Sequence, residues 1–201
     1  MSKSVYSIVL SDGVVELIDA MATRKGMSRS TTINNILADH LSMVTPEKRV
    51  QEILAQAERL LDDSTFQMLP TLADGLLAVR APVRFKYNPT VRCVVELCPA
   101  PSGMQGELRA AARTQSVQLI EALNEFFVMF AHYSGFASTA CHVEGGRFTL
   151  GFLLPVADGD EAAAYIADLL QTMQRAMQGF FAAHPDRATC AAAVREICTN
   201  G

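Results

Sequence analysis

Residues 4–41, SVYSIVLSDGVVELIDAMATRKGMSRSTTINNILADHL, decide the fold of the N-terminal part of this chain. Apolar side chains alternate over residues 4–10, and a period of two residues predicts a short strand. One face of this strand would carry Tyr6, Ile8 and Leu10, and the other Val5, Ser7 and Val9.

Two helices are predicted after the strand. Ser11 stands where a helix N-cap belongs, Gly26 supplies a C-terminal stop, and Ser28 is placed to cap a second helix. Apolar residues recur at helical spacing at Val14, Val15, Leu17, Ile18 and Met21, and again at Ile33, Ile36, Leu37 and Leu41. About 40 residues cannot bury a sufficient core alone. We therefore expect a second copy of the chain to complete this module.

The segment from Val5 to Leu41 resembles the ribbon-helix-helix family of bacterial transcriptional regulators, the MetJ/Arc/CopG group. The resemblance rests on the segments Tyr6–Ser11, Val14–Arg24, Lys25–Ser30 and Ile33–Ala38. It implies an obligate intertwined dimer in which two strands, one per subunit, form an antiparallel ribbon that enters the DNA major groove. It further implies that the N-terminus of the second helix holds a DNA phosphate.

Carried onto this sequence, the resemblance assigns the DNA-binding residues. The ribbon would read bases through Lys3, Val5, Ser7 and Val9, and the phosphate clamp would be Ser28, Arg29 and Ser30. Valine can contact only a thymine methyl group in the groove, because it has no hydrogen-bonding atom in its side chain. The ribbon could therefore discriminate DNA sequence poorly.

The charge of the chain also bears on whether the N-terminal module binds DNA. The net charge of the chain is -4, which excludes a generally basic nucleic-acid binder and leaves only a local patch for DNA. Residues 1–44 balance Lys3, Arg24, Lys25 and Arg29 against Asp12, Glu16, Asp19 and Asp39. Two interpretations follow. One is a sequence-specific, homodimeric transcriptional regulator, a repressor, that binds double-stranded DNA. The alternative is an antitoxin-like adaptor whose degenerate module only dimerises.

The rest of the chain divides into three further regions. Thr45 and Pro46 begin a helix with one apolar face, and the pattern fades from residue 62 to about residue 82. The predicted domains are thus the DNA-binding and dimerisation module at 1–44, a helix and linker at 45–83, an α+β domain at 84–185 and a short helix or tail at 186–201.

The region 84–185 is expected to form a small antiparallel sheet covered by helices on one face. Alternation predicts a long first strand from Arg84 to Leu97, either continuous or broken at Pro89, and Glu107–Arg113 and Arg147–Leu154 as further strands. Helices are predicted from Ser116 to Tyr133 and after a capping box formed by Asp158 and Glu161. The order β-β-α-β-α makes the fold class α+β.

Cations gather on the polar face of the predicted hairpin: Arg84, Lys86, Arg92, Arg109 and Arg113, against Glu96 and Glu107. A small anionic effector, flanking DNA backbone, a subunit contact or plain solvation would each account for this face.

A metal-sensing domain is another candidate for the C-terminal part, because nickel-responsive regulators join such a domain to the same N-terminal module. Cys93, Cys98, His132, Cys141 and His142 lack Cys-x-x-Cys or His-x-His spacing, so no metal site is predicted. No catalytic or cofactor-binding motif stands out either, so we expect neither an enzyme nor a cofactor.

Two observations bear on the cellular compartment. The chain shows no pattern typical of a signal peptide and no run of about 20 apolar residues, so no membrane segment is expected. Its five cysteines are an odd number and read as reduced thiols. The prediction is a cytoplasmic protein.

Overall fold

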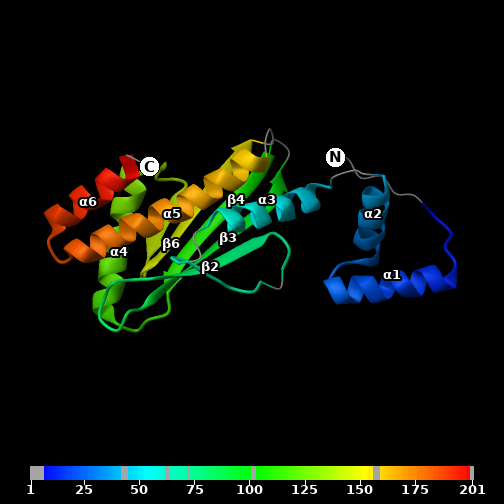
Figure 1. Ribbon diagram of the computed structural model, residues 1–201, viewed down its shortest axis with the longest axis horizontal. Coiled ribbons are helices and arrows are strands. Elements are labelled where there is room, and N and C mark those ends of the chain that lie inside the picture. Colours follow the sequence, from blue (N-terminus) through cyan, green and yellow to red (C-terminus); the bar gives the residue numbers. More distant parts are fainter. Residues whose placement is uncertain are drawn as a thin grey trace. The chain divides into compact units, whose positions relative to one another are not determined.

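The computed structural model describes residues 7–41, 45–61, 64–71, 73–100, 103–155 and 159–199. The chain forms two compact units, residues 1–45 and residues 46–201, which are coloured along the sequence in Figure 1. In the described part of the chain, no helix combines the length and apolar character needed to cross a membrane.

The N-terminal unit contains two helices, α1 (Asp12–Lys25) and α2 (Arg29–His40). Gly26 ends α1 in the left-handed region with φ 64°, and its N–H donates to the carbonyls of Ala22 and Thr23. Ser28 caps α2, because its Oγ accepts a hydrogen bond of 3.1 Å from the N–H of Thr31. Both predicted helices and the Gly-containing turn between them are confirmed.

The predicted ribbon strand is not seen among the described residues of the N-terminal unit. Residues 7–10 lie outside regular secondary structure, and residues 4–6 lie outside the described residues. A strand needs a neighbouring strand for its backbone hydrogen bonds. The described residues of this unit offer only helices, so the ribbon remains a prediction that requires a second copy.

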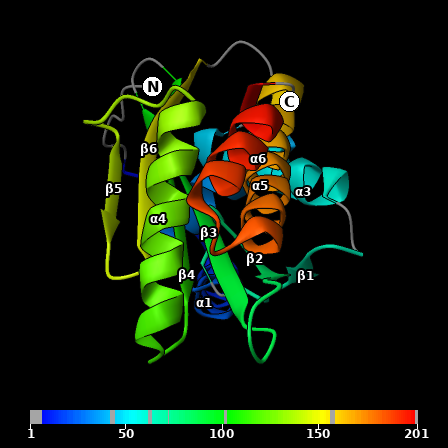
Figure 2. The ribbon, with the colours of Figure 1, turned by 90° about the vertical axis from the view of Figure 1, so that its left-hand side faces the viewer.

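The C-terminal unit is a six-stranded antiparallel sheet covered by four helices. Its elements are α3 (Pro46–Leu60), β1 (Gln67–Met68), β2 (Leu76–Pro82), β3 (Thr90–Ala100), β4 (Gly103–Ala112), α4 (Val117–Tyr133), β5 (Cys141–Glu144), β6 (Arg147–Pro155), α5 (Gly159–Ala183) and α6 (Arg187–Thr199). The strand order is β1-β2-β3-β4-β6-β5. In Figure 2, α4, α5 and α6 lie in front of the strands. The predicted mixed fold with an antiparallel sheet is confirmed.

The core lies between the helices and one face of the sheet. Burial alternates along β3, where Val91, Cys93, Val95 and Leu97 are buried as the period-two pattern predicted. Phenylalanines from α4, α5 and β6 fill the middle of this layer: Phe126, Phe127, Phe130, Phe148 and Phe180 are each at most 1% exposed. The opposite face of the sheet remains open to solvent, as an antiparallel sheet allows.

The linker predicted within 45–83 is wrong. Helix α3 packs on α5 and on the sheet, and β2 pairs with β3 along its whole length. The strand was missed because Ala78 and Val79 are both buried, so the segment lacks the clean alternation of a half-buried strand. The C-terminal unit therefore begins at Pro46, and its sheet is larger than predicted.

The predicted first strand also begins too early. Residues 84–89 form a turn, in which Tyr87 and Asn88 adopt positive φ angles of 68° and 46°. Phe85 leaves the alternating pattern and packs its ring 5.6 Å from that of Phe181. Strand β3 starts only at Thr90, after Pro89, because proline cannot donate to the ladder.

Two further details concern the second half of the chain. The four-residue strand β5 was not predicted, because its length gives too little periodicity. Asp158 of the predicted capping box lies outside the described residues.

Helix α6 forms at the C-terminal end of the described chain. Asp186 caps it by accepting a hydrogen bond from the N–H of Ala188, and the helix packs on α4 and α5. Residues 186–199 are therefore part of the packed C-terminal unit and not a tail.

Candidate nucleic-acid interface

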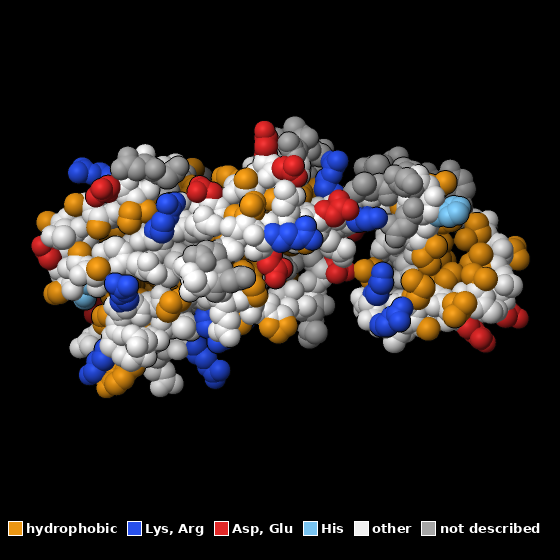
Figure 3. All heavy atoms as spheres, viewed as in Figure 1, with side chains coloured by type: hydrophobic (Ala, Val, Ile, Leu, Met, Phe, Trp, Pro, Cys, Tyr) orange, Lys and Arg blue, Asp and Glu red, His pale blue; other side chains and the backbone are white. Residues whose placement is uncertain are grey.

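The helices of the N-terminal unit leave most of their apolar side chains exposed. Within this unit only Ile18, Ala22, Ala38, Thr32 and Thr45 are buried among the described residues. The exposed set is Ile8, Val9, Val14, Leu17, Ile36, Leu37 and Leu41, in which Leu17 is 68% and Leu41 is 65% exposed. Figure 3 shows hydrophobic side chains gathered over one broad area of this unit. A patch of this kind marks an interaction surface.

The exposed set includes most of the helical positions whose spacing suggested a buried face. Val14 and Leu17 come from α1, and Ile36, Leu37 and Leu41 come from α2 and its end. These positions recur on helices as expected, but the single chain leaves them exposed, so their burial by a second copy stays a prediction. Ile8 and Val9 add the segment before α1 to the same exposed apolar set.

The predicted ribbon residues are only partly described. Lys3 and Val5 lie outside the described residues. Ser7 and Val9 are exposed, and the side chain of Val9 is fully accessible. Both side chains are therefore accessible from solvent.

The predicted phosphate clamp lies at the N-terminus of α2. Ser28 Oγ is occupied as the helix cap and also lies 2.8 Å from Thr31 Oγ1. The backbone amides of Arg29 and Ser30 belong to the first turn, where helix geometry provides no intrahelical acceptor. Ser30 is exposed. The positive end of the α2 dipole and two amides are thus available to an anion.

Arg29 has a partner that the sequence did not reveal. Its Nε and Nη2 donate to the two carboxylate oxygens of Asp19 on α1, at 2.6 and 2.5 Å. These hydrogen bonds lower the pKa of Asp19 below its usual range and raise the pKa of the Arg29 guanidinium. The pair is largely exposed and joins α1 to α2. A phosphate would have to compete with Asp19 for Arg29.

The five cations predicted for the hairpin do not share one face of the sheet. Arg84 and Lys86 lie in the turn before β3, and Arg113 follows β4, while Arg92 and Arg109 belong to the open face. Arg109 is engaged by Glu96 and by Glu107, the latter at 3.2 Å. The structure adds two cations to the open face: Arg80 on β2 and Arg147 on β6.

The cysteine and histidine residues considered for metal binding lie apart. Cys93 is buried beneath the helices, whereas His142 pairs with Thr149 on the open face and contacts Glu144 at 3.3 Å. Among the described residues, no group of three His, Cys, Asp or Glu side chains is arranged to hold a metal ion.

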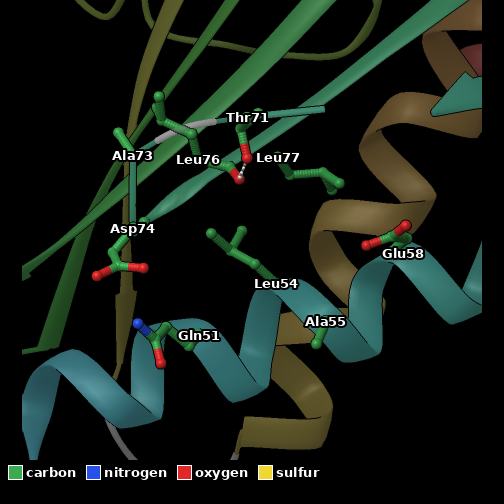
Figure 4. Close-up of a pocket in the computed structure, with 10 residues that line it drawn as sticks. Gln51, Leu54, Ala55, Glu58, Thr71, Ala73, Asp74, Leu76 and Leu77 are labelled. Carbon is green, nitrogen blue, oxygen red and sulfur yellow. Dashed lines mark hydrogen bonds between the residues drawn. The ribbon is translucent and has the colours of Figure 1, made fainter. Parts of the chain in front are cut away.

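One surface depression lies between α3 and the segment that leads into β2, with a volume of about 230 Å³. Figure 4 shows its labelled lining residues, which are Gln51, Leu54, Ala55, Glu58, Thr71, Ala73, Asp74, Leu76 and Leu77. The charged groups in this lining are the carboxylates of Glu58 and Asp74. The depression therefore offers nothing for a nucleic-acid phosphate.

No family model, curated protein or solved structure matches this chain. In the N-terminal unit, the described features available to a macromolecule are the exposed apolar area and the N-terminus of α2.

Proposed function

We propose that the chain is a homodimeric, cytoplasmic transcriptional regulator, a repressor, that binds double-stranded DNA through residues 1–44. The observation that carries the proposal is the exposed apolar surface of a unit too small to have its own core. A second copy supplies the missing cover, and the two segments at residues 4–10 pair as the ribbon.

The energetics favour a dimer over a solvated monomer. Fully burying one Val, Leu or Ile side chain contributes roughly 1.5–3 kcal/mol. Association costs on the order of 4–15 kcal/mol in lost freedom of the two chains. The exposed apolar residues of both copies together can offset that cost, with the ribbon hydrogen bonds adding to the association.

Sedimentation velocity tests the dimer. Leu37→Glu places a charge in the exposed apolar area of α2, and we expect it to raise the dimer dissociation constant at least a hundredfold. Val128→Glu is the matched control, because Val128 is an exposed apolar residue on α4 of the other unit. A wild-type chain that sediments as a monomer at micromolar concentration would refute the dimer.

Arg29 and Asp19 give the DNA proposal a sharp test. In fluorescence-anisotropy titrations with duplex from the gene's own upstream region, Arg29→Gln should weaken binding about tenfold, because it removes a charge-assisted contact to phosphate. Asp19→Asn should tighten binding several-fold, because it releases Arg29 from its ion pair. Glu16→Gln is the control, since Glu16 is an exposed carboxylate of the same helix.

The adaptor alternative makes a different prediction. Counterion release makes DNA binding fall steeply with salt, whereas a module that only dimerises binds no duplex at any salt. Titrations at two salt concentrations, with an unrelated duplex beside the upstream one, separate these cases. Equal affinity for both duplexes would identify a ribbon that does not discriminate sequence. Absence of binding at low salt would leave the dimerisation function alone.

A further inference from the structure

The open face of the C-terminal sheet carries a row of arginines across four strands. Arg80 on β2 is the register partner of Arg92 on β3, Arg92 is opposite Ala111 on β4, and Ala111 is opposite Arg147 on β6. Residues directly opposite one another in antiparallel strands point to the same face. The three arginines are exposed, whereas the residues beside them in their strands, Val79, Ala81, Val91, Cys93 and Phe148, are buried.

Among the described residues, the three arginines of this row lack the carboxylate partners that the neighbouring Arg109 has. Arg109, on the same face of β4, is held by the carboxylates of Glu96 and Glu107. In the described part of the chain, no ion pair involves Arg80, Arg92 or Arg147.

The carboxylate nearest to the row in register makes no ion pair with it among the described residues. Glu144 is the register partner of Arg147, yet it contacts His142 instead. Like charges directly opposite each other, as at Arg80 and Arg92, destabilise a sheet. The chain as a whole is acidic, with a net charge of -4, so the row does not follow from a generally basic surface.

The spacing of the row suits a small anion. Adjacent strands lie about 4.8 Å apart, so the backbones at Arg92 and Arg147 are separated by roughly 10 Å across Ala111. Two arginine side chains can converge over that distance, and the small side chain of Ala111 leaves the space between them open. Guanidinium groups bind phosphate through paired hydrogen bonds, and several cations match its multiple charge.

We infer that Arg80, Arg92 and Arg147 bind the phosphate groups of a small phosphorylated ligand over Ala111. The site lies wholly in the C-terminal unit and does not depend on DNA binding by the N-terminal unit. Its ligand is the natural candidate for an effector of the regulator.

Isothermal titration of the full chain with inorganic pyrophosphate, at constant ionic strength, tests the site. The wild type should bind saturably, and Arg92→Gln and Arg147→Gln should each weaken binding at least tenfold. Arg195→Gln removes the same charge from the exposed side of α6 in the same unit and should change affinity less than twofold. Equal weakening by Arg195→Gln would show general electrostatic attraction and overturn the site.

Thermal unfolding provides an independent readout that also reports on folding. Without ligand, Arg92→Gln should raise the melting temperature, because it removes the like-charge pair with Arg80. Pyrophosphate should raise the melting temperature of the wild type but not that of Ala111→Glu, which places a carboxylate among the arginines. Lack of any pyrophosphate binding by the wild type overturns the inference. If, in addition, Arg92→Gln loses duplex binding, the arginine row contacts nucleic-acid backbone and not a small phosphorylated ligand.

Discussion

Amphipathic helices occur in both units of this chain, but their apolar faces are buried in one unit and largely exposed in the other. In the C-terminal unit, the apolar face of α5 is buried from Ala162 to Phe181 against the sheet and neighbouring helices. In the N-terminal unit, Leu17 of α1 and Leu37 of α2 stay more than half exposed. Both patterns predicted a buried face. The difference shows that helical periodicity identifies a face that needs a partner, but not whether that partner is in the same chain.

Size explains the contrast. The C-terminal unit has a six-stranded sheet, which offers a broad apolar face to four helices. The N-terminal unit has two helices in its described part and no sheet of its own. Surface-to-volume scaling leaves a unit of about 45 residues unable to bury enough apolar area. The C-terminal unit buries its apolar residues within one chain, whereas the described N-terminal helices leave many of theirs exposed.

The largest expected effect concerns the core of the complete unit. Phe126 on α4 is fully buried, and its ring lies 5.2 to 5.9 Å from those of Phe127, Phe130 and Phe180. Phe126→Ala should lower the free energy of unfolding by about 3–5 kcal/mol, because it leaves a cavity. Denaturant unfolding followed by circular dichroism measures this loss. Val128→Ala, two residues along at an exposed position, should change stability by no more than about 0.5 kcal/mol.

The second largest effect is expected on dilution, which should change the stability of one unit and not of the other. If the N-terminal unit is stable only as a dimer, its stability depends on protein concentration, whereas that of the C-terminal unit does not. Hydrogen exchange should therefore quicken on dilution at the amides of Ile18 and Ala22 and stay constant at Phe126 and Phe127. Equal exchange at all concentrations would mean that the N-terminal unit holds together alone.

Thiol reactivity should sharpen the comparison within the C-terminal unit. Burial raises the pKa of Cys93 to about 12, so at pH 8 this thiol stays protonated and shielded beneath the helices. Cys98, five residues along the same strand, is exposed. Alkylation followed by mass spectrometry should label Cys98 at least a hundredfold faster than Cys93. Comparable rates would show that the helix layer opens readily.

The smallest effect concerns the ion pair within the N-terminal unit. Arg29 lowers the pKa of Asp19, so the pair contributes to stability above the ordinary pKa of an aspartate. That contribution is lost as the pH falls through the lowered pKa of Asp19. A carboxyl NMR titration should find the pKa of Asp19 rising in Arg29→Gln and returning toward its usual value in high salt. An unchanged pKa would mean that the pair does not persist in solution.

Local signals in the sequence determined much of the secondary structure. Gly26 ends α1 because the chain there needs a left-handed backbone conformation. Helices begin after Ser28, Ser116 and Asp186 because their side-chain oxygens accept hydrogen bonds from backbone N–H groups of the first turn. The buried face of β3 followed from its period of two residues. These features depend on neighbouring residues, so the sequence by itself was enough to place them.

The tertiary structure alone decided which segments pair and which charges meet. Strand β2 belongs to the sheet because β1 and β3 flank it, and its own pattern, in which Ala78 and Val79 are both buried, could not show that pairing. Arg29 meets Asp19 only because two helices fold together, and the row of Arg80, Arg92 and Arg147 exists only through strand register. Such contacts join residues from different helices or strands, and the spacing of residue types along the sequence does not show how close those elements lie in space.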